Sequence, residues 1–370
     1  MEILMNSDID AYGSMFKVKK DLIDRALELH DEALVVDQHS DIQMDVVTRR
    51  GRGETKVIER IHLPKMVTGG VDFTAVSTPP RYNYRPHPYF STATHCALQM
   101  IDCIYMEIEE NPDQLALVHT SAEILRAKKE GKRSIMLCME GAEALDTDLS
   151  LLRNFYKLGV RIIELTWHQK NLVADGCGEP SNSGLSNFGK ELLKEMNRIG
   201  MVIDISHSSE AAFWDTLSLS QVPIFASHSN ARAVCNHPRN LYDDQIKSLA
   251  KKGGIMGMNF LGQFVRDQNP TVQDVLDHVD HIANLVGVEY IGLGPDWIDY
   301  APQLILNCLD PKDYLSIRIP ITIYAKGLEK EEELPNLTIG LLARGYSEKD
   351  IQKILGGNFL RFLDAAQTPC

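Results

Sequence analysis

Apolar, β-branched runs alternate with amphipathic stretches along almost the whole 370-residue chain. Short, continuous apolar runs are typical of parallel strands that are buried on both faces. The eight predicted strands are Ala33–Asp41, Val71–Ser77, Ser134–Glu140, Val160–Trp167, Met201–His207, Pro223–His228, Gly254–Phe260 and Tyr290–Asp296. The amphipathic stretches predicted as helices include Thr92–Glu109, Asn187–Arg198, Ser209–Leu217, Asp243–Lys251 and Val272–Val286. This alternation predicts an α/β fold, a (β/α)8 TIM-type barrel.

An open, doubly wound sheet is the alternative arrangement of the same elements. Its dinucleotide-binding form carries a Gly-x-Gly-x-x-Gly motif after the first strand, and no such motif follows residues 33–41. We expect a single barrel domain, residues 1–370, with an N-terminal helical extension and an insertion at about 300–335. The length of this Pro-, Ile- and Leu-rich insertion predicts a lid or an oligomer contact, such as a homodimer interface. The basic, Gly-rich segment Arg49–Glu54 is expected to be a mobile loop near the barrel mouth.

Charge and composition argue against several classes of protein. The net formal charge of −13 is unlike that of a nucleic-acid-binding protein, whose surface is normally basic. No stretch approaches the roughly 20 apolar residues that span a bilayer, and residues 1–8 lack the basic and apolar regions of a secretory signal. The seven cysteines form no Cys-x-x-Cys pair, which favours reduced thiols over disulfides or a cysteine-based zinc site. We therefore expect a cytoplasmic enzyme with neither a nucleic-acid partner nor a membrane partner.

Two of the predicted strands end in a histidine. His207 closes one apolar run and His228 closes the next, and a helical pattern follows each of them. In an α/β barrel, metal-binding and catalytic side chains lie at the carboxyl edge of the strands. The two histidines therefore predict a metal site at that edge.

Three other predicted strands end in groups that could complete such a site. His39 and Asp41 are two positions apart on the first strand, so their side chains point to the same side. Glu140 ends the third strand, where a carboxylate is costly to desolvate unless a cation or hydrogen bonds satisfy it, so it is a candidate for bridging two ions. Asp296 ends the eighth strand and could be a metal ligand or a proton shuttle. Taken singly, these residues could equally be polar strand ends, helix caps or turn residues.

Together these side chains supply three imidazoles and three carboxylates, which are enough for two divalent ions that share Glu140. Ligation by nitrogen and oxygen without thiolate favours zinc, with manganese, cobalt or iron as alternatives. His168, after the fourth strand, could contact a substrate oxygen or be an ordinary rim histidine. Arg239, after the sixth strand, could pair with a substrate carboxylate or be an ordinary loop arginine.

The ordered set of motifs resembles the membrane (renal) dipeptidase family, the metallopeptidases of peptidase family M19. The resemblance extends from Val35 to Leu363. Its motifs are Asp37-x-His39-x-Asp41, Ile61-His62-Leu63-Pro64, Gly69-Gly70-Val71, Glu140-Gly141, Asp204-Ile205-Ser206-His207, Ala226-Ser227-His228-Ser229, Arg239-Asn240, Ile291-Gly292-Leu293-Gly294-Pro295-Asp296 and Gly356-Gly357-Asn358-Phe359-Leu360-Arg361.

This resemblance implies a barrel of the metal-dependent hydrolase kind with two zinc ions per chain. His39 and Asp41 would hold one ion, His207 and His228 the other, and Glu140 would bridge them. Around the first motif the family often shows Asp-Gly-His-Asn-Asp. This chain departs from that pattern at Gln38 and Ser40 but retains the ligand types.

The resemblance also implies roles in catalysis and substrate binding. Asp296 would be the catalytic acid/base in contact with the substrate, and Glu140 would belong to the catalytic centre as the bridging ligand. Arg239 would bind the C-terminal carboxylate of the substrate. His168 would correspond to the substrate-binding histidine of the family, although counting from Arg161 places Trp167 on that position.

The implied activity is hydrolysis of dipeptides, including those with a C-terminal D-residue, by a hydroxide held between the two metal ions. A related metal-dependent amidohydrolase that acts on N-acyl amino acids, lactones or a peptide-like natural product is the alternative. A third interpretation is a non-catalytic barrel that serves as a binding module. The complete ligand set argues against that third interpretation.

Overall fold

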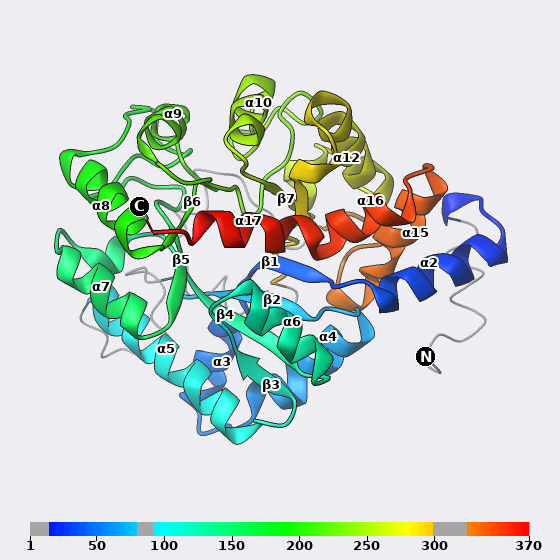
Figure 1. Cartoon of the computed structure of the whole chain (residues 1–370), viewed down its shortest axis with the longest axis horizontal. Helices are drawn as coiled ribbons and strands as arrows, with labels where there is room; N and C mark the ends of the chain where they lie inside the picture. The colour runs from blue at the N-terminus through cyan, green and yellow to red at the C-terminus, as the bar shows by residue number, and fades with distance from the viewer. Residues whose placement is uncertain (1–14, 80–91, 299–323, 370) are drawn as a thin grey trace.

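The strands form a parallel sheet that follows the predicted order. The computed structural model describes residues 15–79, 92–298 and 324–369 (Figure 1). Five strands pair as parallel neighbours in sequence order: β1 (Val36–Ser40), β2 (Phe73–Ser77), β4 (Arg133–Glu140), β5 (Val160–Glu164) and β6 (Val202–Asp204). A second parallel pair consists of β7 (Met256–Met258) and β8 (Ile291–Leu293).

Single backbone bridges join the two sheets into a closed barrel. Phe225 bridges to Asp204 of β6, and Ala226 bridges to Met256 of β7, both in parallel orientation. On the other side β8 packs against β1, where Gly292 leaves room for the side chain of Gln38 because a Cβ would collide with it. Eight parallel segments therefore surround the barrel axis. The predicted (β/α)8 barrel is confirmed, and the open sheet is excluded.

The sixth predicted strand, Pro223–His228, is reduced to these two bridges because side chains accept its next backbone hydrogen bonds. The N–H of Ser227 donates to Asp204 Oδ1 at 3.1 Å, and the N–H of His228 donates to Ser206 Oγ at 3.2 Å. Pro223, at the start of the run, has no N–H to donate. The regular backbone pairing is consequently interrupted at Ser227 and His228, and only the N–H of Ser229 donates again to the backbone of β7, at the carbonyl oxygen of Gly257.

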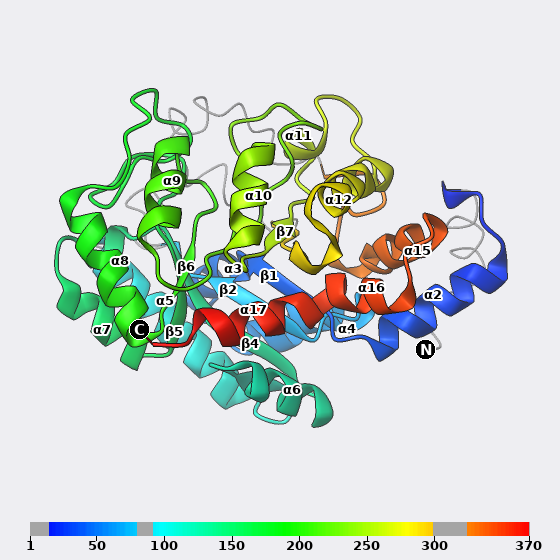
Figure 2. The ribbon, with the colours of Figure 1, turned by 45° about the horizontal axis from the view of Figure 1, so that its top comes forward.

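Helices cover the outside of the barrel (Figures 1 and 2). Their ends carry the expected caps: Ser186 Oγ accepts from the N–H of Gly189 at the start of α8, and Gly200 ends that helix with a φ of 75°. The helices are α2 (Lys20–Glu32), α3 (Ile42–Arg50), α4 (Leu63–Thr68), α5 (Ala93–Glu110), α6 (Ser121–Lys129), α7 (Leu149–Lys157), α8 (Asn187–Ile199), α9 (Glu210–Leu219), α10 (Asp243–Lys251), α11 (Gly262–Val265), α12 (Val272–Val286), α15 (Pro335–Ala343), α16 (Glu348–Gln352) and α17 (Asn358–Ala366). Single-turn segments are η1 (Ile58–His62), η2 (Glu143–Leu145), η3 (Val288–Tyr290), η4 (Glu331–Glu333) and η5 (Lys353–Gly357). Among the helices of the described residues, none is both long and apolar enough to cross a bilayer.

The C-terminal helix α17 runs across the strands and packs on the amino end of the barrel (Figure 1). Phe359 and Phe362 are fully buried there and contact Phe225, while Phe359 also contacts Phe73 near the start of β2. Beside α16, which leads into α17, helix α2 packs against α15 (Figure 1). Because α17 covers the amino end of the barrel, the carboxyl edge is the end at which a site can form.

The structure corrects three details of the sequence analysis. The strand predicted as Val160–Trp167 ends at Glu164, and an additional short strand, β3 (Leu115–Leu117), pairs with the start of β4. The expectation of a mobile Arg49–Glu54 loop is wrong for Arg49 and Arg50, which lie in the last turn of α3, whereas Arg52 is in the exposed turn that follows the helix. The guanidinium of Arg50 is buried and binds Glu107 and Glu110.

Most of the predicted 300–335 insertion, up to residue 323, lies outside the described residues, and with it the predicted lid or oligomer contact. The described part begins at Tyr324, which forms an antiparallel bridge to Leu261. Its hydroxyl donates to the carbonyl oxygen of Asp296 at 2.9 Å. This end of the insertion is therefore attached to the carboxyl edge of β8.

Candidate metal centre

The predicted ligands lie together at the carboxyl edge of the barrel. His39 is the penultimate residue of β1, Asp41 directly follows β1, and Glu140 is the last residue of β4. His207 follows β6, and His228 follows the bridged segment between β6 and β7. All five are buried. The parallel arrangement brings them to one edge although they are spread over 190 residues of sequence, since all of these strands end at the same edge of the barrel.

The carboxylate of Glu140 lies near both His39 and His207. Its Oε1 atom is 3.5 Å from His207 Nε2 and 3.9 Å from His39 Nε2. Asp41 Oδ1 is 3.7 Å from His39 Nε2. The Nε2 atoms of His207 and His228 are 2.8 Å apart, and the rings of His39 and His228 stack with their centroids 3.8 Å apart. The Glu140 carboxylate therefore faces the imidazoles of both His39 and His207.

Several overlapping groups of side chains could hold a cation. Within each group the ligand atoms lie within 4.8 Å of one another. The groups, among the described residues, are His39 with Asp41 and Glu140; His39 with His228 and Asp296; Glu140 with Glu164, His207 and His228; and His168 with Cys177 and His207. Buried imidazole and carboxylate ligands at this spacing fit divalent zinc, manganese, cobalt or iron.

Two residues of this region have a left-handed backbone. The φ angles are 64° at His207 and 62° at Asp296, a conformation that costs energy for residues other than glycine. His207 is held by a hydrogen bond of 2.6 Å from the N–H of Cys177 to its carbonyl oxygen. The side-chain amide of Asn259 donates to Asp296 Oδ2 at 2.9 Å. The surrounding contacts therefore fix both residues in orientations that a regular strand would not give.

Buried acidic residues support the loops that carry the histidines. Asp204 Oδ1 accepts from the N–H of Ser206 at 2.9 Å and from the N–H of Ser227, so one carboxylate joins the loops of His207 and His228. Asp37 Oδ1 accepts from the N–H of His39 at 3.0 Å. Burial raises the pKa of Asp204 above the usual value for an aspartate, and it raises the pKa of Asp37 well above that value.

Ser227 orients the neighbouring imidazole directly. Its Oγ shares a hydrogen bond of 2.6 Å with His228 Nδ1. Because that bond occupies Nδ1, the other ring nitrogen, Nε2, is the one turned towards His207. Hydrogen bonds of this kind commonly fix the ring orientation of metal-binding histidines.

Two polar residues of the cluster were not predicted. Glu164 ends β5 in register with Glu140, is buried, and places Oε1 3.8 Å from His207 Nε2. The sequence does contain the signal, a carboxylate inside an apolar run, but the run continues through Leu165 and Trp167 and hides the strand end. Cys177 comes from an irregular loop for which the sequence offers no periodicity.

The predicted substrate-binding residues lie beside the cluster. His168 Nδ1 is 3.1 Å from His207 Nδ1. Arg239 is 2 % exposed, donates from Nη2 to the carbonyl oxygen of His228 at 2.9 Å, and lies over the ring of Phe264. Asp296 is partly exposed and belongs to the group with His39 and His228. All eight predicted site residues are therefore gathered in one region.

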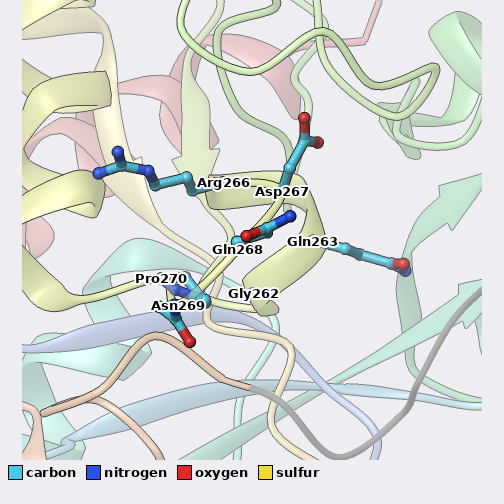
Figure 3. A pocket seen from close by; sticks show the side chains of 7 residues that line it. All are labelled: Gly262, Gln263, Arg266, Asp267, Gln268, Asn269 and Pro270. Atoms are coloured by element: carbon cyan, nitrogen blue, oxygen red, sulfur yellow. The ribbon is translucent and has the colours of Figure 1, made fainter.

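A separate cavity of about 280 Å³ lies on the loop between α11 and α12 (Figure 3). Gln263 of α11 and Arg266, which directly follows α11, extend in opposite directions. Its lining is formed by Gly262, Gln263, Arg266, Asp267, Gln268, Asn269 and Pro270. None of these lining residues belongs to the ligand cluster, so this cavity is distinct from the metal centre.

The sequence and the fold of this chain are similar to those of known proteins. The family described as membrane dipeptidase (peptidase family M19) matches residues 23–318 and 312–369. Dipeptidase verJ of Clonostachys rogersoniana is 31 % identical over 363 residues, which are 94 % of this chain and 88 % of that protein. Dipeptidase 3 of Mus musculus is 36 % identical over 276 residues, 73 % of this chain but 51 % of that protein. The crystal structure of a metallopeptidase called dipeptidase AC, of family M19, superposes with a TM-score of 0.77 at 25 % identity and covers 90 % of this chain and 98 % of its own.

Proposed function

Because the chain belongs to the membrane dipeptidase family, peptidase family M19, and is thus a metallo-dipeptidase, we propose that it cleaves the peptide bond of free dipeptides with the aid of two zinc ions. The observation that carries the choice of substrate is a buried cation beside the ligand cluster. Arg239 is almost fully buried, and within the described residues it forms no ion pair with an aspartate or glutamate. A dipeptide brings both a scissile amide for the cluster and a free carboxylate for this guanidinium.

The donor atoms suit two ions rather than one. His39 and Asp41 would hold the first ion, His207 and His228 the second, and Glu140, within 4 Å of imidazoles on both sides, would bridge them. Bound zinc would supply a water of lowered pKa and polarisation of the scissile carbonyl. Glu164 adds a further buried carboxylate, which increases the negative charge available to balance two dications.

Asp296 is suited to proton transfer. Its side chain is partly exposed, lies beside His39 and His228, and is oriented by the amide of Asn259. Its carboxylate would accept the proton of the attacking water and return it to the leaving amine. The hydrogen bond from Asn259 would hold the carboxylate in position for both transfers.

Arg239 would align the substrate. Its Nε atom is buried and has no hydrogen-bond partner within the described residues, while Nη2 is engaged by the carbonyl of His228. A buried guanidinium without a carboxylate partner is costly, so an incoming carboxylate gains a charge-assisted hydrogen bond and relieves that cost. This contact would favour dipeptides over longer chains, whose second residue carries no free carboxylate. The imidazole of His168, whose Nδ1 atom is 3.1 Å from His207 Nδ1, would contact the oxygen of the scissile carbonyl group.

A substrate panel tests this function. Zinc-loaded protein is incubated with L,L- and L,D-dipeptides, with their C-terminal amides, and with N-acyl amino acids and lactones. We expect hydrolysis of free dipeptides and at least tenfold slower hydrolysis of the amides, because the amides cannot pair with Arg239. Preferential cleavage of N-acyl amino acids or lactones would replace dipeptidase activity with the amidohydrolase alternative.

A further inference from the structure

The loop that carries Cys177 is attached to the backbone of two histidines. The N–H of Cys177 donates to the carbonyl oxygen of His207 at 2.6 Å, and the N–H of Gly178 donates to the carbonyl oxygen of His168 at 2.9 Å. Gly176 forms an antiparallel bridge to Ser208, and a Cβ at Gly176 would collide with the carbonyl oxygens of Trp167 and His168. Backbone hydrogen bonds therefore hold the Cys177 thiol beside both imidazoles.

The three side chains bring their ligand atoms together. Cys177 Sγ is 3.7 Å from His168 Nδ1, which is 3.1 Å from His207 Nδ1. The ligand atoms of the group all lie within 4.8 Å of one another. Cys177 is partly exposed, whereas both imidazoles of the group are buried.

His207 faces two different sets of ligands through its two ring nitrogens. Nε2 faces Glu140, Glu164 and His228, whereas Nδ1 faces His168 on the side of Cys177. An ion at the thiol would therefore adjoin the dizinc centre without needing any of its carboxylates.

We propose that His168, Cys177 and His207 form an additional, inhibitory binding site for a thiophilic divalent cation such as Cd²⁺ or excess Zn²⁺. Sulfur and imidazole ligands favour these ions over the hard cations that prefer oxygen. When the ion binds, the Cys177 thiol and the Nδ1–H group of a His207 that already holds zinc through Nε2 would each release a proton to solvent, which leaves His207 as an imidazolate between the two ions. The inhibitory part rests on the proposed dipeptidase function, because occupation of His168 withdraws it from the substrate. The binding part rests on the geometry of the three side chains alone.

The binding part is tested by adding Cd²⁺ to zinc-loaded protein and recording the ultraviolet cadmium–thiolate charge-transfer band together with the bound metal after dialysis. We expect one additional ion per chain and a band in the wild type. Both should disappear in Cys177→Ser and persist in Cys235→Ser, a matched control at a buried cysteine whose Sγ donates to the carbonyl oxygen of Gln263. Absence of the band in the wild type, or its persistence in Cys177→Ser, overturns the site.

The inhibitory part is tested by dipeptidase assays at increasing Cd²⁺. Measured against its own activity in zinc alone, Cys177→Ser should require at least tenfold more Cd²⁺ for half inhibition than the wild type or Cys235→Ser. Equal sensitivity of all three proteins overturns the inhibitory role. If the protein binds Cd²⁺ through Cys177 but cleaves no dipeptide, the proposed function fails and the site stands. If it cleaves dipeptides without a thiolate band, the site fails and the proposed function stands.

Discussion

Glu140 and Glu164 end neighbouring parallel strands in the same register, and both approach one nitrogen of His207. Glu140 Oε1 is 3.5 Å and Glu164 Oε1 is 3.8 Å from His207 Nε2. Two buried carboxylates this close to one imidazole form a set of ligands suited to a divalent cation. We therefore expect a cation to bind at this pair, and metal binding to stabilise the fold.

Glu164→Gln should weaken metal binding. The substitution keeps the size of the side chain but removes a negative charge beside His207, and loss of such a group typically lowers metal affinity about 10–100-fold. Competition with a chromophoric chelator measures the affinity. Glu191→Gln, at an exposed glutamate of α8, is the control and should bind metal like the wild type. Wild-type affinity in Glu164→Gln would show that this carboxylate does not contribute to the centre.

Asp296→Asn should abolish most activity while leaving the metal content unchanged. Asparagine tolerates the left-handed backbone at this position, where φ is 62°, so the fold is preserved while the group that carries the proton is lost. We expect kcat to fall by about 10²–10⁴-fold. Steady-state kinetics and elemental analysis of the same preparation provide both readouts. Full activity in the variant would remove Asp296 from the proton-transfer step.

Arg239→Lys should raise KM more than it lowers kcat. Lysine retains the charge but lacks the planar guanidinium fork that matches a carboxylate. We expect KM for a free dipeptide to rise about tenfold or more, and little change for the corresponding amide. Arg232→Lys is a control in the same loop region, since the guanidinium of Arg232 lies over Tyr242 instead. Equal effects of Arg239→Lys on acid and amide would argue against recognition of the carboxylate.

The buried, neutral imidazole of His278 should lower the free energy of unfolding in mild acid. Its imidazole is buried, Nε2 donates to the carbonyl of Val265, and Nδ1 accepts from the N–H of Ala231. Burial lowers the pKa of His278 to about 4 from an unfolded value of about 6.5. Below pH 6.5 the unfolded chain therefore binds a proton that the folded chain does not, and stability is lost as the pH falls towards 4.

The loss attributable to His278 is about 3 kcal/mol at pH 4. Urea unfolding of the wild type and His278→Gln at pH 7 and pH 4.5 isolates it, because acid effects on the metal ligands are common to both proteins. The variant should be less stable at pH 7 and lose less stability on acidification. Parallel pH profiles for the two proteins would contradict this assignment.

The ligands that could be predicted lie at or just after the end of an apolar run. Glu140 directly follows such a run, and His39, His207 and His228 each come within three residues of the last apolar residue, because buried parallel strands favour apolar sequence close to the carboxyl edge. The barrel was predictable for the same reason. Its helices α10 and α12 begin and end at the predicted residues.

The rest depends on tertiary contacts that leave no local pattern. Glu164 ends β5, but the apolar sequence continues beyond it, and Leu165 donates its N–H to Asp204 of the neighbouring strand. Cys177 reaches the site through a loop whose conformation is set by hydrogen bonds to His168 and His207. Arg50 appeared to belong to a solvated basic loop because its partners, Glu107 and Glu110, lie 57 and 60 residues away in sequence.

The central claim is that His39, Asp41, Glu140, His207 and His228 hold two metal ions for dipeptide hydrolysis. Its most direct test is the metal content of purified, zinc-loaded protein after extensive dialysis, measured by inductively coupled plasma mass spectrometry. We predict about two zinc ions per chain. A protein that retains no stoichiometric metal and still cleaves dipeptides at an undiminished rate would contradict the account.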